Sequence, residues 1–278
     1  MILRGRKFEF TFPRPSLVMG ILNVTPDSFS DGGRYFDLDA AVQRGLAMAG
    51  EGAEIIDVGG ESSRPGAIPV SAGEELRRIL PVIEELARHL AIPISVDTQK
   101  VEVAAAAIKK GADIVNDIGG SREDTGMARL VRDTGAAYVL MHMQGTPATM
   151  QVNPQYQNVV EEVHSFFEGG LERLMRLGVA REQIIFDIGI GFGKNVSHNV
   201  ALLAALERFA DFHRPLLLGA SRKSFISKLL QVEESKRLPG SLACAQWAVL
   251  QGVQIIRTHD VAETVQVLRL TEAIRGDR

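Results

Sequence analysis

Polar and charged residues follow short apolar runs at several points along this chain, and their types suggest two kinds of chemistry. Asp97, Asn116 and Asp187 supply carboxylates and an amide, which can accept the N–H donors on the edge of a flat, guanidine-like ring. Cations and hydroxyls come later, in residues 219–224 (GASRKS) and 257–259 (RTH), where they could hold an anion such as a diphosphate. The sequence therefore predicts a site that takes a flat heterocycle and an anionic group together.

Two long polar segments could close over such a site. Residues 23–33 read NVTPDSFSDGG and residues 59–66 read GGESSRPG, and both are too rich in turn residues to form a helix or a strand. Long loops at the mouth of a site often act as lids, and Arg64 in the second segment adds a cation for the anion. The structural alternative is that Pro26 and Asp27 merely shape a turn.

Each candidate residue also has a structural interpretation. Asp97 and Asn116 could cap the helices that follow them, and a tight turn explains the glycines after Asp187. Ser221 is not in a G-x-S-x-G elbow, and His142 has no second histidine at helical spacing, so we predict neither a serine nucleophile nor a histidine metal site. We favour the functional interpretation for the cations as a group, because desolvated cations need partners.

The elements that must position these residues follow from eight apolar runs. The runs lack alternation, which is typical of strands buried on both faces, and helical patterns separate them. The runs cover residues 17–22, 54–58, 92–96, 112–115, 137–141, 184–188, 215–219 and 253–257, and the helical stretches cover 38–50, 74–90, 99–110, 123–134, 156–177, 199–210, 240–251 and 261–274. Eight strand–helix units favour a closed (β/α)8 TIM barrel over a doubly wound open sheet. Residues 5–14 fit no unit and predict an N-terminal β-hairpin that caps the barrel floor.

Length and composition narrow the possibilities further. The 278 residues suit one barrel, so we expect a single domain over residues 1–278. A net charge of −3 gives no indication of nucleic-acid binding. Cys244 is the only cysteine, which excludes an intrachain disulfide, and its apolar helical context predicts a buried thiol rather than a nucleophile. The chain lacks an apolar stretch long enough to span a membrane and its first residues lack a signal-peptide core, so we expect a cytoplasmic protein with no membrane partner.

Eight motifs in register carry a resemblance to a known family. They read NVTPDSFSDGG, DVGGESSRPG, SVDTQK, NDI, HMQGTPATMQ, GIGFGK, GASRKSF and RTHDV, and they span residues 23–261. Because these motifs occur in this order, the sequence resembles the dihydropteroate synthase family of folate biosynthesis. The resemblance implies a transferase that joins 6-hydroxymethyl-7,8-dihydropterin diphosphate to p-aminobenzoate with Mg²⁺, releasing diphosphate and 7,8-dihydropteroate. It also implies a homodimer, which could form through the apolar helix around Trp247.

The same resemblance assigns roles to individual residues, with catalysis resting on Asn23, Asp97, Lys223, Arg257 and His259. It implies a pterin site of Asp97, Asn116, Asp187 and Lys223, a diphosphate site of Ser63, Arg64, Arg257 and His259, a p-aminobenzoate site of Phe29, Pro65, Phe192, Lys223 and Ser224, and a magnesium ligand in Asn23. Residues 23–33 and 61–70 would close over the site.

The chain departs from the family pattern at a few positions. Ile188 stands where the family usually has proline, Ser63 where threonine is frequent, and Thr258 where valine is frequent. Ile188 could loosen the loop that supports Asp187. Two alternatives stay open, namely a pterin-binding methyltransferase on the same barrel and a non-catalytic paralogue. The anion-binding motifs SRKS and RTHD argue against the first, and the presence of both long loops argues against the second.

Overall fold

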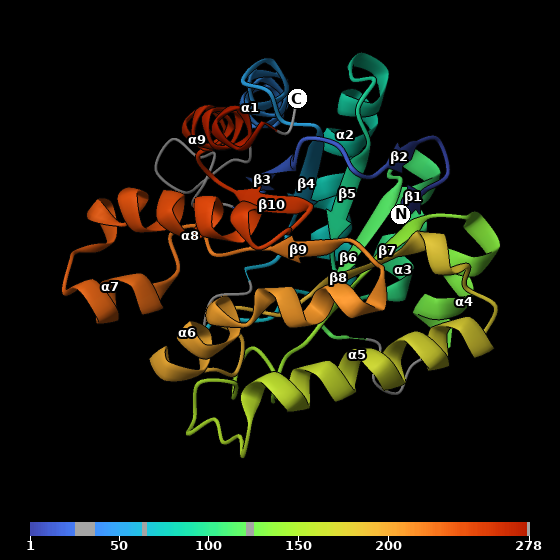
Figure 1. Cartoon of the computed structure of the whole chain (residues 1–278). Coiled ribbons are helices and arrows are strands. Elements are labelled where there is room, and N and C mark those ends of the chain that lie inside the picture. The colour runs from blue at the N-terminus through green and yellow to red at the C-terminus, as the bar shows by residue number, and fades with distance from the viewer. Residues whose placement is uncertain (26–36, 63–65, 121–124, 277–278) are drawn as a thin grey trace.

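Eight parallel strands form a closed barrel in a computed structural model that describes residues 1–25, 37–62, 66–120 and 125–276 (Figure 1). The strands are β3 (Leu17–Asn23), β4 (Ile55–Gly59), β5 (Ile94–Asp97), β6 (Ile114–Asp117), β7 (Ala137–Met141), β8 (Ile184–Asp187), β9 (Leu216–Leu218) and β10 (Ile255–Thr258). Each strand pairs with the next along the chain, and β10 closes the barrel against β3. The predicted (β/α)8 TIM barrel is confirmed, and each apolar run of the sequence overlaps one of these strands.

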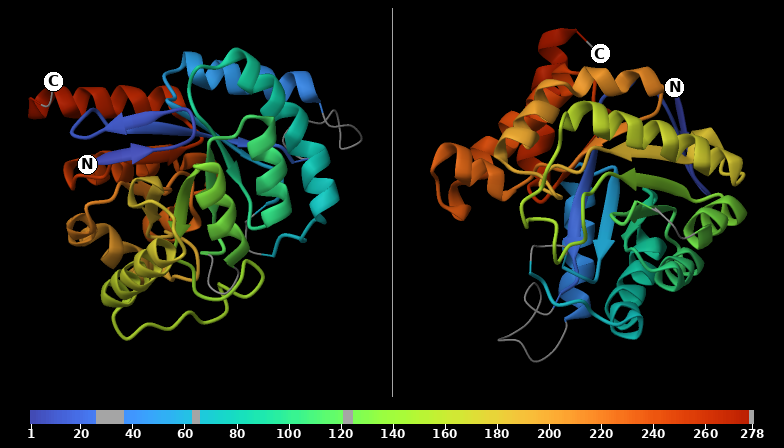
Figure 2. Two further views of the ribbon diagram at one scale, coloured as in Figure 1. Left: turned by 90° about the vertical axis from the view of Figure 1, so that its right-hand side faces the viewer. Right: turned by 90° about the horizontal axis from the view of Figure 1, so that it is seen from below.

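Helices surround the barrel and connect its strands (Figure 2). They are α1 (Leu38–Gly50), α2 (Ala72–His89), α3 (Val101–Lys110), α4 (Thr125–Thr134), α5 (Val159–Arg176), α6 (Val196–Ala204), α7 (Ser224–Leu230), α8 (Leu238–Leu250) and α9 (Val261–Arg275), with 3₁₀ turns at Arg181–Gln183, Leu206–Phe212 and Glu234–Lys236. No helix among the described residues is long and apolar enough to cross a membrane.

Two helical segments differ from the sequence prediction. The stretch expected as one helix over 199–210 divides into α6 and the 3₁₀ turn that follows it. Leu206, Phe209 and Phe212 are the buried residues of that turn, and their spacing of three matches a 3₁₀ helix rather than an α-helix. The seven-residue helix α7 was not predicted, because it is too short to show a helical period.

The N-terminal hairpin closes the floor of the barrel as predicted, although it starts earlier than expected. Its strands are β1 (Ile2–Arg4) and β2 (Glu9–Thr11), paired antiparallel. Leu3 and Phe12 are buried against the lower barrel interior, which is formed by apolar residues such as Leu17 and Ile255. The hairpin therefore covers the end of the barrel opposite the strand C-termini (Figure 2).

Alternate residues of each strand face opposite sides and divide the core into two parts. Ile56 and Val96 pack in the outer cluster beneath the helices, whereas Ile55 and Ile114 pack in the inner cluster. Toward the C-terminal ends of the strands, the positions that face the barrel interior are occupied by polar residues. They are Asp57 on β4, Asp97 on β5, Asn116 on β6, Asp187 on β8 and Arg257 on β10. The barrel interior thus changes from apolar at its floor to polar at its mouth.

Candidate active site

A buried ion-pair network occupies the mouth of the barrel. Arg257 donates from Nε to Asp57 Oδ2 at 2.6 Å and from Nη2 to Asp97 Oδ2 at 2.7 Å. Asn116 Nδ2 donates to the same Asp57 oxygen at 3.0 Å. Asp57 is fully buried, and neither its Oδ1 nor that of Asn116 has a hydrogen-bond partner among the described residues. Because buried polar atoms are normally paired, these two acceptors indicate a place for N–H donors of a ligand.

The charges in this network are unequal, since two carboxylates share one guanidinium. Burial raises the pKa of Asp97 to about 7; the Arg257 charge opposes this shift, and the nearby charge of Asp57 adds to it. Burial alone would lower the pKa of Arg257, but Asp57 and Asp97 reverse that effect and hold it above its ordinary value. Arg257 therefore stays charged, while Asp97 is poised to titrate near neutral pH.

Asp187 and Lys223 form a second charged group on the other side of the mouth. Asp187 Oδ1 accepts the Gly189 amide at 2.8 Å, and Lys223 Nζ donates to the Ile190 carbonyl and lies 4.4 Å from the centre of the Phe192 ring. Burial raises the pKa of Asp187, and the Lys223 charge opposes this shift. Burial likewise lowers the pKa of Lys223 to about 8, with Asp187 opposing. An aromatic face, a carboxylate and an amine are thus brought together.

The turns after β9 and β10 meet through Ser221 and His259. Ser221 Oγ accepts the His259 backbone amide at 3.2 Å and lies 3.0 Å from His259 Nδ1. Thr258 Oγ1 also donates to Ser221 Oγ at 3.5 Å, so both acceptor positions of this hydroxyl are taken and we assign its own proton to the bond with Nδ1, which places the ring proton of the neutral histidine on Nε2. Nε2 is then the nitrogen of this ring able to donate to an anion.

A cavity of about 260 Å³ opens beside Asp97, and Lys100, Glu61, Ile118 and Pro147 contribute to its lining. A larger hollow of about 780 Å³ lies between the segment after β7 and the start of α5, and none of the predicted site residues lines it. No group of three or more His, Cys, Asp or Glu side chains able to hold a metal ion occurs within the ranges that the structure covers.

Comparison with known proteins identifies the family to which this chain belongs. Residues 19–259 match the family model described as "Pterin binding enzyme". The dihydropteroate synthase of Escherichia coli K12 is 50% identical over 273 residues, which cover 98% of this chain and 95% of that relative. The chain belongs to the dihydropteroate synthase family. It is therefore a pterin-binding transferase, and the methyltransferase alternative is set aside.

Solved structures of the dihydropteroate synthase family agree with this assignment. The Yersinia pestis enzyme, solved with a sulfonamide drug complex, has a TM-score of 0.93 at 46% identity, and the match covers 99% of this chain and all of that one. The Xanthomonas albilineans enzyme, solved with 4-aminobenzoic acid, has a TM-score of 0.91 at 42% identity, with 99% of each chain covered.

The structure brings most of the predicted residues of this dihydropteroate synthase family member to one face of the barrel. Asp97, Asn116 and Arg257 share one network, Asp187, Lys223 and Phe192 form the second group, and His259 lies in the turn after β10. Asn23 ends β3 beside Gly59, and Ser224 is the exposed first residue of α7. Phe29, Ser63, Arg64 and Pro65 lie outside the described residues, as do parts of both long loops. The roles of all these residues stay predictions.

Among the buried charged residues that sequence reasoning did not single out, Asp57 and Lys194 bear directly on the site. Asp57 is the fourth residue of the apolar run at 54–58, and such a run does not show which of its residues face the barrel interior. Lys194 is 2% exposed and donates to the carbonyls of His142, Gly189 and Phe192 at 3.0–3.2 Å, as well as lying 3.0 Å from His142 Nδ1. His142, which the sequence left without a role, therefore helps to hold the segment that follows Asp187.

Proposed function

We propose that this chain condenses 6-hydroxymethyl-7,8-dihydropterin diphosphate with p-aminobenzoate to give 7,8-dihydropteroate and diphosphate. The observation that carries the proposal is the pair of unpartnered acceptors, Asp57 Oδ1 and Asn116 Oδ1, buried beside the cation Arg257 at the barrel mouth. A flat pterin edge rich in N–H donors satisfies such acceptors. The binding of 4-aminobenzoic acid by the Xanthomonas albilineans relative supports p-aminobenzoate as the second substrate.

In the proposed reaction the protein mainly binds, orients and stabilises charge. Asp97, Asn116 and Asp187 hold the pterin ring by accepting its N–H groups, and Arg257 and His259 donate to the diphosphate. The bond between the pterin methylene and the diphosphate oxygen breaks, and both bonding electrons leave with diphosphate. Cations fixed beside the leaving group favour this step because its negative charge grows in the transition state.

Departure of diphosphate leaves a cation on the pterin methylene, which the electron-rich ring stabilises. The amine of p-aminobenzoate then forms the new carbon–nitrogen bond and releases a proton. Phe192 and Lys223 border the proposed arylamine position, which their 4.4 Å contact supports. No enzymic nucleophile is needed, and the thiol of Cys244 does not suit that role, since burial raises its pKa to about 11.

Mg²⁺ is proposed as the cofactor, and the residues present fit it. Mg²⁺ usually takes one or two protein oxygens together with substrate phosphates and waters, so it does not require an acidic cluster. Asn23, at the C-terminal end of β3, offers one amide oxygen. When bound, the ion would neutralise part of the charge on the departing diphosphate.

Turnover of dihydropterin diphosphate with p-aminobenzoate, assayed with and without Mg²⁺, tests the proposal. We expect dihydropteroate to form and its rate to depend on the metal. Asp187→Ala should abolish pterin binding in calorimetry, whereas Glu161→Gln, on the exposed part of α5, should bind as wild type does. A wild-type protein that binds pterin but forms no dihydropteroate would instead support the non-catalytic paralogue.

We further propose that residues 1–278 act as one domain and that this domain pairs as a homodimer. Seven of the eleven large apolar side chains that are exposed among the described residues lie on α6 to α9. They are Val200, Leu229, Leu230, Trp247, Leu250, Leu270 and Ile274. Clustering of exposed apolar side chains on neighbouring helices favours a protein interface there. The cytoplasmic location stays a prediction.

A further inference from the structure

One residue between two predicted site residues has a left-handed backbone. Arg222 has a φ of 54° and lies between Ser221, which contacts His259, and Lys223, which contacts Ile190 and Phe192. A non-glycine residue in this conformation is strained, because its Cβ crowds the backbone. The turn sends two neighbouring side chains toward different parts of the site, so something must hold it.

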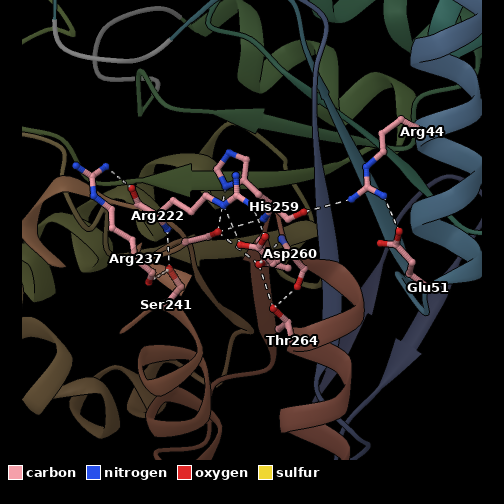
Figure 3. Close-up of polar contacts among 10 residues, drawn as sticks. Arg44, Glu51, Arg222, Arg237, Ser241, His259, Asp260 and Thr264 are labelled. Atoms are coloured by element: carbon pink, nitrogen blue, oxygen red, sulfur yellow. Dashed lines mark hydrogen bonds and ion pairs between the residues drawn. The ribbon is translucent and has the colours of Figure 1, made fainter. Parts of the chain in front are cut away.

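Contacts from several elements hold Arg222 in this conformation (Figure 3). Its amide donates to Ser241 Oγ at 2.8 Å, and its carbonyl accepts from Arg237 Nη1 at 2.9 Å. Its guanidinium makes a two-pronged ion pair with Asp260, with Nε at 3.0 Å from Oδ2 and Nη2 bonded to Oδ1. The Asp260 side chain is only 9% exposed, so solvent screens this pair less than an ordinary surface pair.

Asp260 is itself fixed, and it adjoins His259. Its amide donates to Thr258 Oγ1 at 3.1 Å, and its carbonyl accepts from Thr264 Oγ1 at 2.6 Å (Figure 3). Thr258 replaces the valine that is frequent in the family, so here a hydroxyl fastens the turn after β10. The Arg222–Asp260 pair consequently joins two turns, one that carries Ser221 and Lys223 and one that carries His259.

We propose that Arg222 is a positioning residue whose ion pair with Asp260 holds the strained turn that directs Ser221 and Lys223 into the site. This inference rests on the proposed function, because Lys223 and His259 are its proposed substrate-binding groups. The guanidinium itself is 52% exposed and points to Asp260, so it acts through its neighbours and not on the substrates. Its backbone conformation is what the site requires.

Two substitutions at this one position separate the ion pair from the backbone. Arg222→Ala removes the pair and keeps the strain, whereas Arg222→Gly removes the pair and the strain together, since glycine adopts positive φ readily. We expect Arg222→Ala to lose about 30-fold in kcat, because small misplacements of reacting groups can cost that much. The kcat of Arg222→Gly should lie within about fivefold of the wild-type kcat, because glycine avoids the energy penalty that other residues have in a left-handed backbone conformation. Asp260→Asn should behave as Arg222→Ala does.

The measurements are kcat and both KM values, taken well below the melting temperature of each variant. Glu161→Gln is the control, because it breaks an exposed ion pair, with Arg208, that involves none of the predicted site residues. Equal losses in Arg222→Ala and Arg222→Gly, or wild-type kinetics in both, would overturn the inference. A merely structural role predicts lower melting temperatures with unchanged kcat.

Binding of inorganic diphosphate with Mg²⁺, measured by calorimetry, tests the turn without turnover. We expect the affinity to fall in the order wild type, Arg222→Gly, Arg222→Ala, and the same affinity in all three would also overturn the inference. If wild type is active and both variants have the same kinetics and diphosphate affinity as wild type, the positioning role of Arg222 is wrong, whereas the proposed function stands. If wild type forms no dihydropteroate, the proposed function fails, and the order of diphosphate affinities still decides the role of Arg222.

Discussion

At the scale of single residues, the site is defined by a surplus of buried negative charge. Asp57 and Asp97 share Arg257, and Asn116 donates to Asp57 without neutralising it. A buried carboxylate without a full counter-charge tends to keep its proton, which is why the pKa of Asp97 is raised to about 7. A ligand that brings N–H donors stabilises the ionised form, so ligand binding and ionisation of Asp97 should be coupled.

That coupling predicts the pH dependence of the reaction. As the pH rises through about 7, Asp97 ionises and becomes a better acceptor, so kcat/KM for the dihydropterin substrate should rise. As the pH rises above about 8, Lys223 loses its charge and kcat/KM should fall. The expected profile is a bell with limbs near these values. Asp97→Asn should be less active and lack the acid limb; an acid limb that persists in this variant would assign it to another group.

Asp57 should control the position of the acid limb. Its charge helps to raise the pKa of Asp97, so Asp57→Asn should move the acid limb to lower pH. In Asp57→Asn one oxygen can still accept from Arg257 and Asn116, but an N–H2 donor replaces the acceptor Oδ1, which has no partner among the described residues, so we expect kcat/KM to fall about 10- to 100-fold, the usual cost of a buried polar group left without its partner. The pH profiles of wild type and variant provide the measurement. An acid limb that does not move would contradict this account of Asp97.

The sequence predicts the polar residues at the strand ends only in part. Asp97, Asn116 and Asp187 could be singled out, and the structure places all three on the inner face, at the last or next-to-last positions of β5, β6 and β8. Asp57 has the same place in its apolar run (EIIDV) as Asp187 has in its own (IIFDI), but it was missed, because a strand buried on both faces lacks the alternation of polarity that would assign its faces. The closed barrel shows that Ile55 faces the interior, and Asp57, two residues further along the same strand, therefore points inward as well.

At the scale of elements, a buried lysine of the shared motif GIGFGK holds the segment after β8, in which the proline usual in the family is missing. Ile188 takes the place of that proline and is fully buried in the outer core. Gly189 has a φ of 66°, and a Cβ there would lie 1.9 Å from the His142 carbonyl oxygen, so only glycine fits. Lys194 then binds the carbonyls of this segment and of His142. The sequence-based expectation that Ile188 could loosen this loop did not consider Lys194, which binds the loop's carbonyls.

Lys194→Met should therefore destabilise the protein. Methionine keeps the volume of the side chain but removes one hydrogen bond from each of the carbonyls of His142, Gly189 and Phe192, although Gly189 keeps the bond from the Phe192 amide at 3.0 Å. A loss of about 3 kcal/mol or more is expected when buried hydrogen bonds to a charged donor are removed, and for a chain of this size it would lower the melting temperature by about 6–12 °C. Thermal unfolding followed by circular dichroism provides the measurement.

Lys110→Met is the matched control for Lys194→Met. Lys110 forms an exposed ion pair with Glu84 at 2.8 Å, and its loss should change the melting temperature little. Equal melting temperatures for the two variants would show that Lys194 does not hold the segment after β8.

At the scale of the whole molecule, barrel closure could be predicted because eight similar strand–helix units leave few other arrangements. The order of the strands then follows from the short connections between neighbours. The faces of the outer helices could not be predicted in the same way. Helix α8 is apolar nearly all round, so its sequence does not show which side chains the fold leaves exposed. In the structure Trp247 and Leu250 are on the exposed side of that helix, 43% and 44% accessible.

Those exposed residues adjoin a second apolar stripe on α9, and together they predict the assembly state. Leu270 and Ile274 lie one turn apart and are 64% and 77% exposed. Helices α8 and α9 are neighbours (Figure 1), and Gln246 Nε2 on α8 donates to Thr271 Oγ1 on α9 at 3.2 Å. Burying these stripes against a second copy removes apolar area from water at no cost to the barrel.

We expect wild type to be a dimer in multi-angle light scattering and the double variant Leu270→Glu, Ile274→Lys to be a folded monomer. Two charged side chains would have to be desolvated in the interface, which costs several kcal/mol without good partners, whereas in the monomer both remain in water. The matched control is Met175→Glu, because Met175 is an exposed apolar residue on α5, on another part of the barrel surface. A dimer that survives the double substitution, or one that Met175→Glu disrupts instead, would place the interface elsewhere.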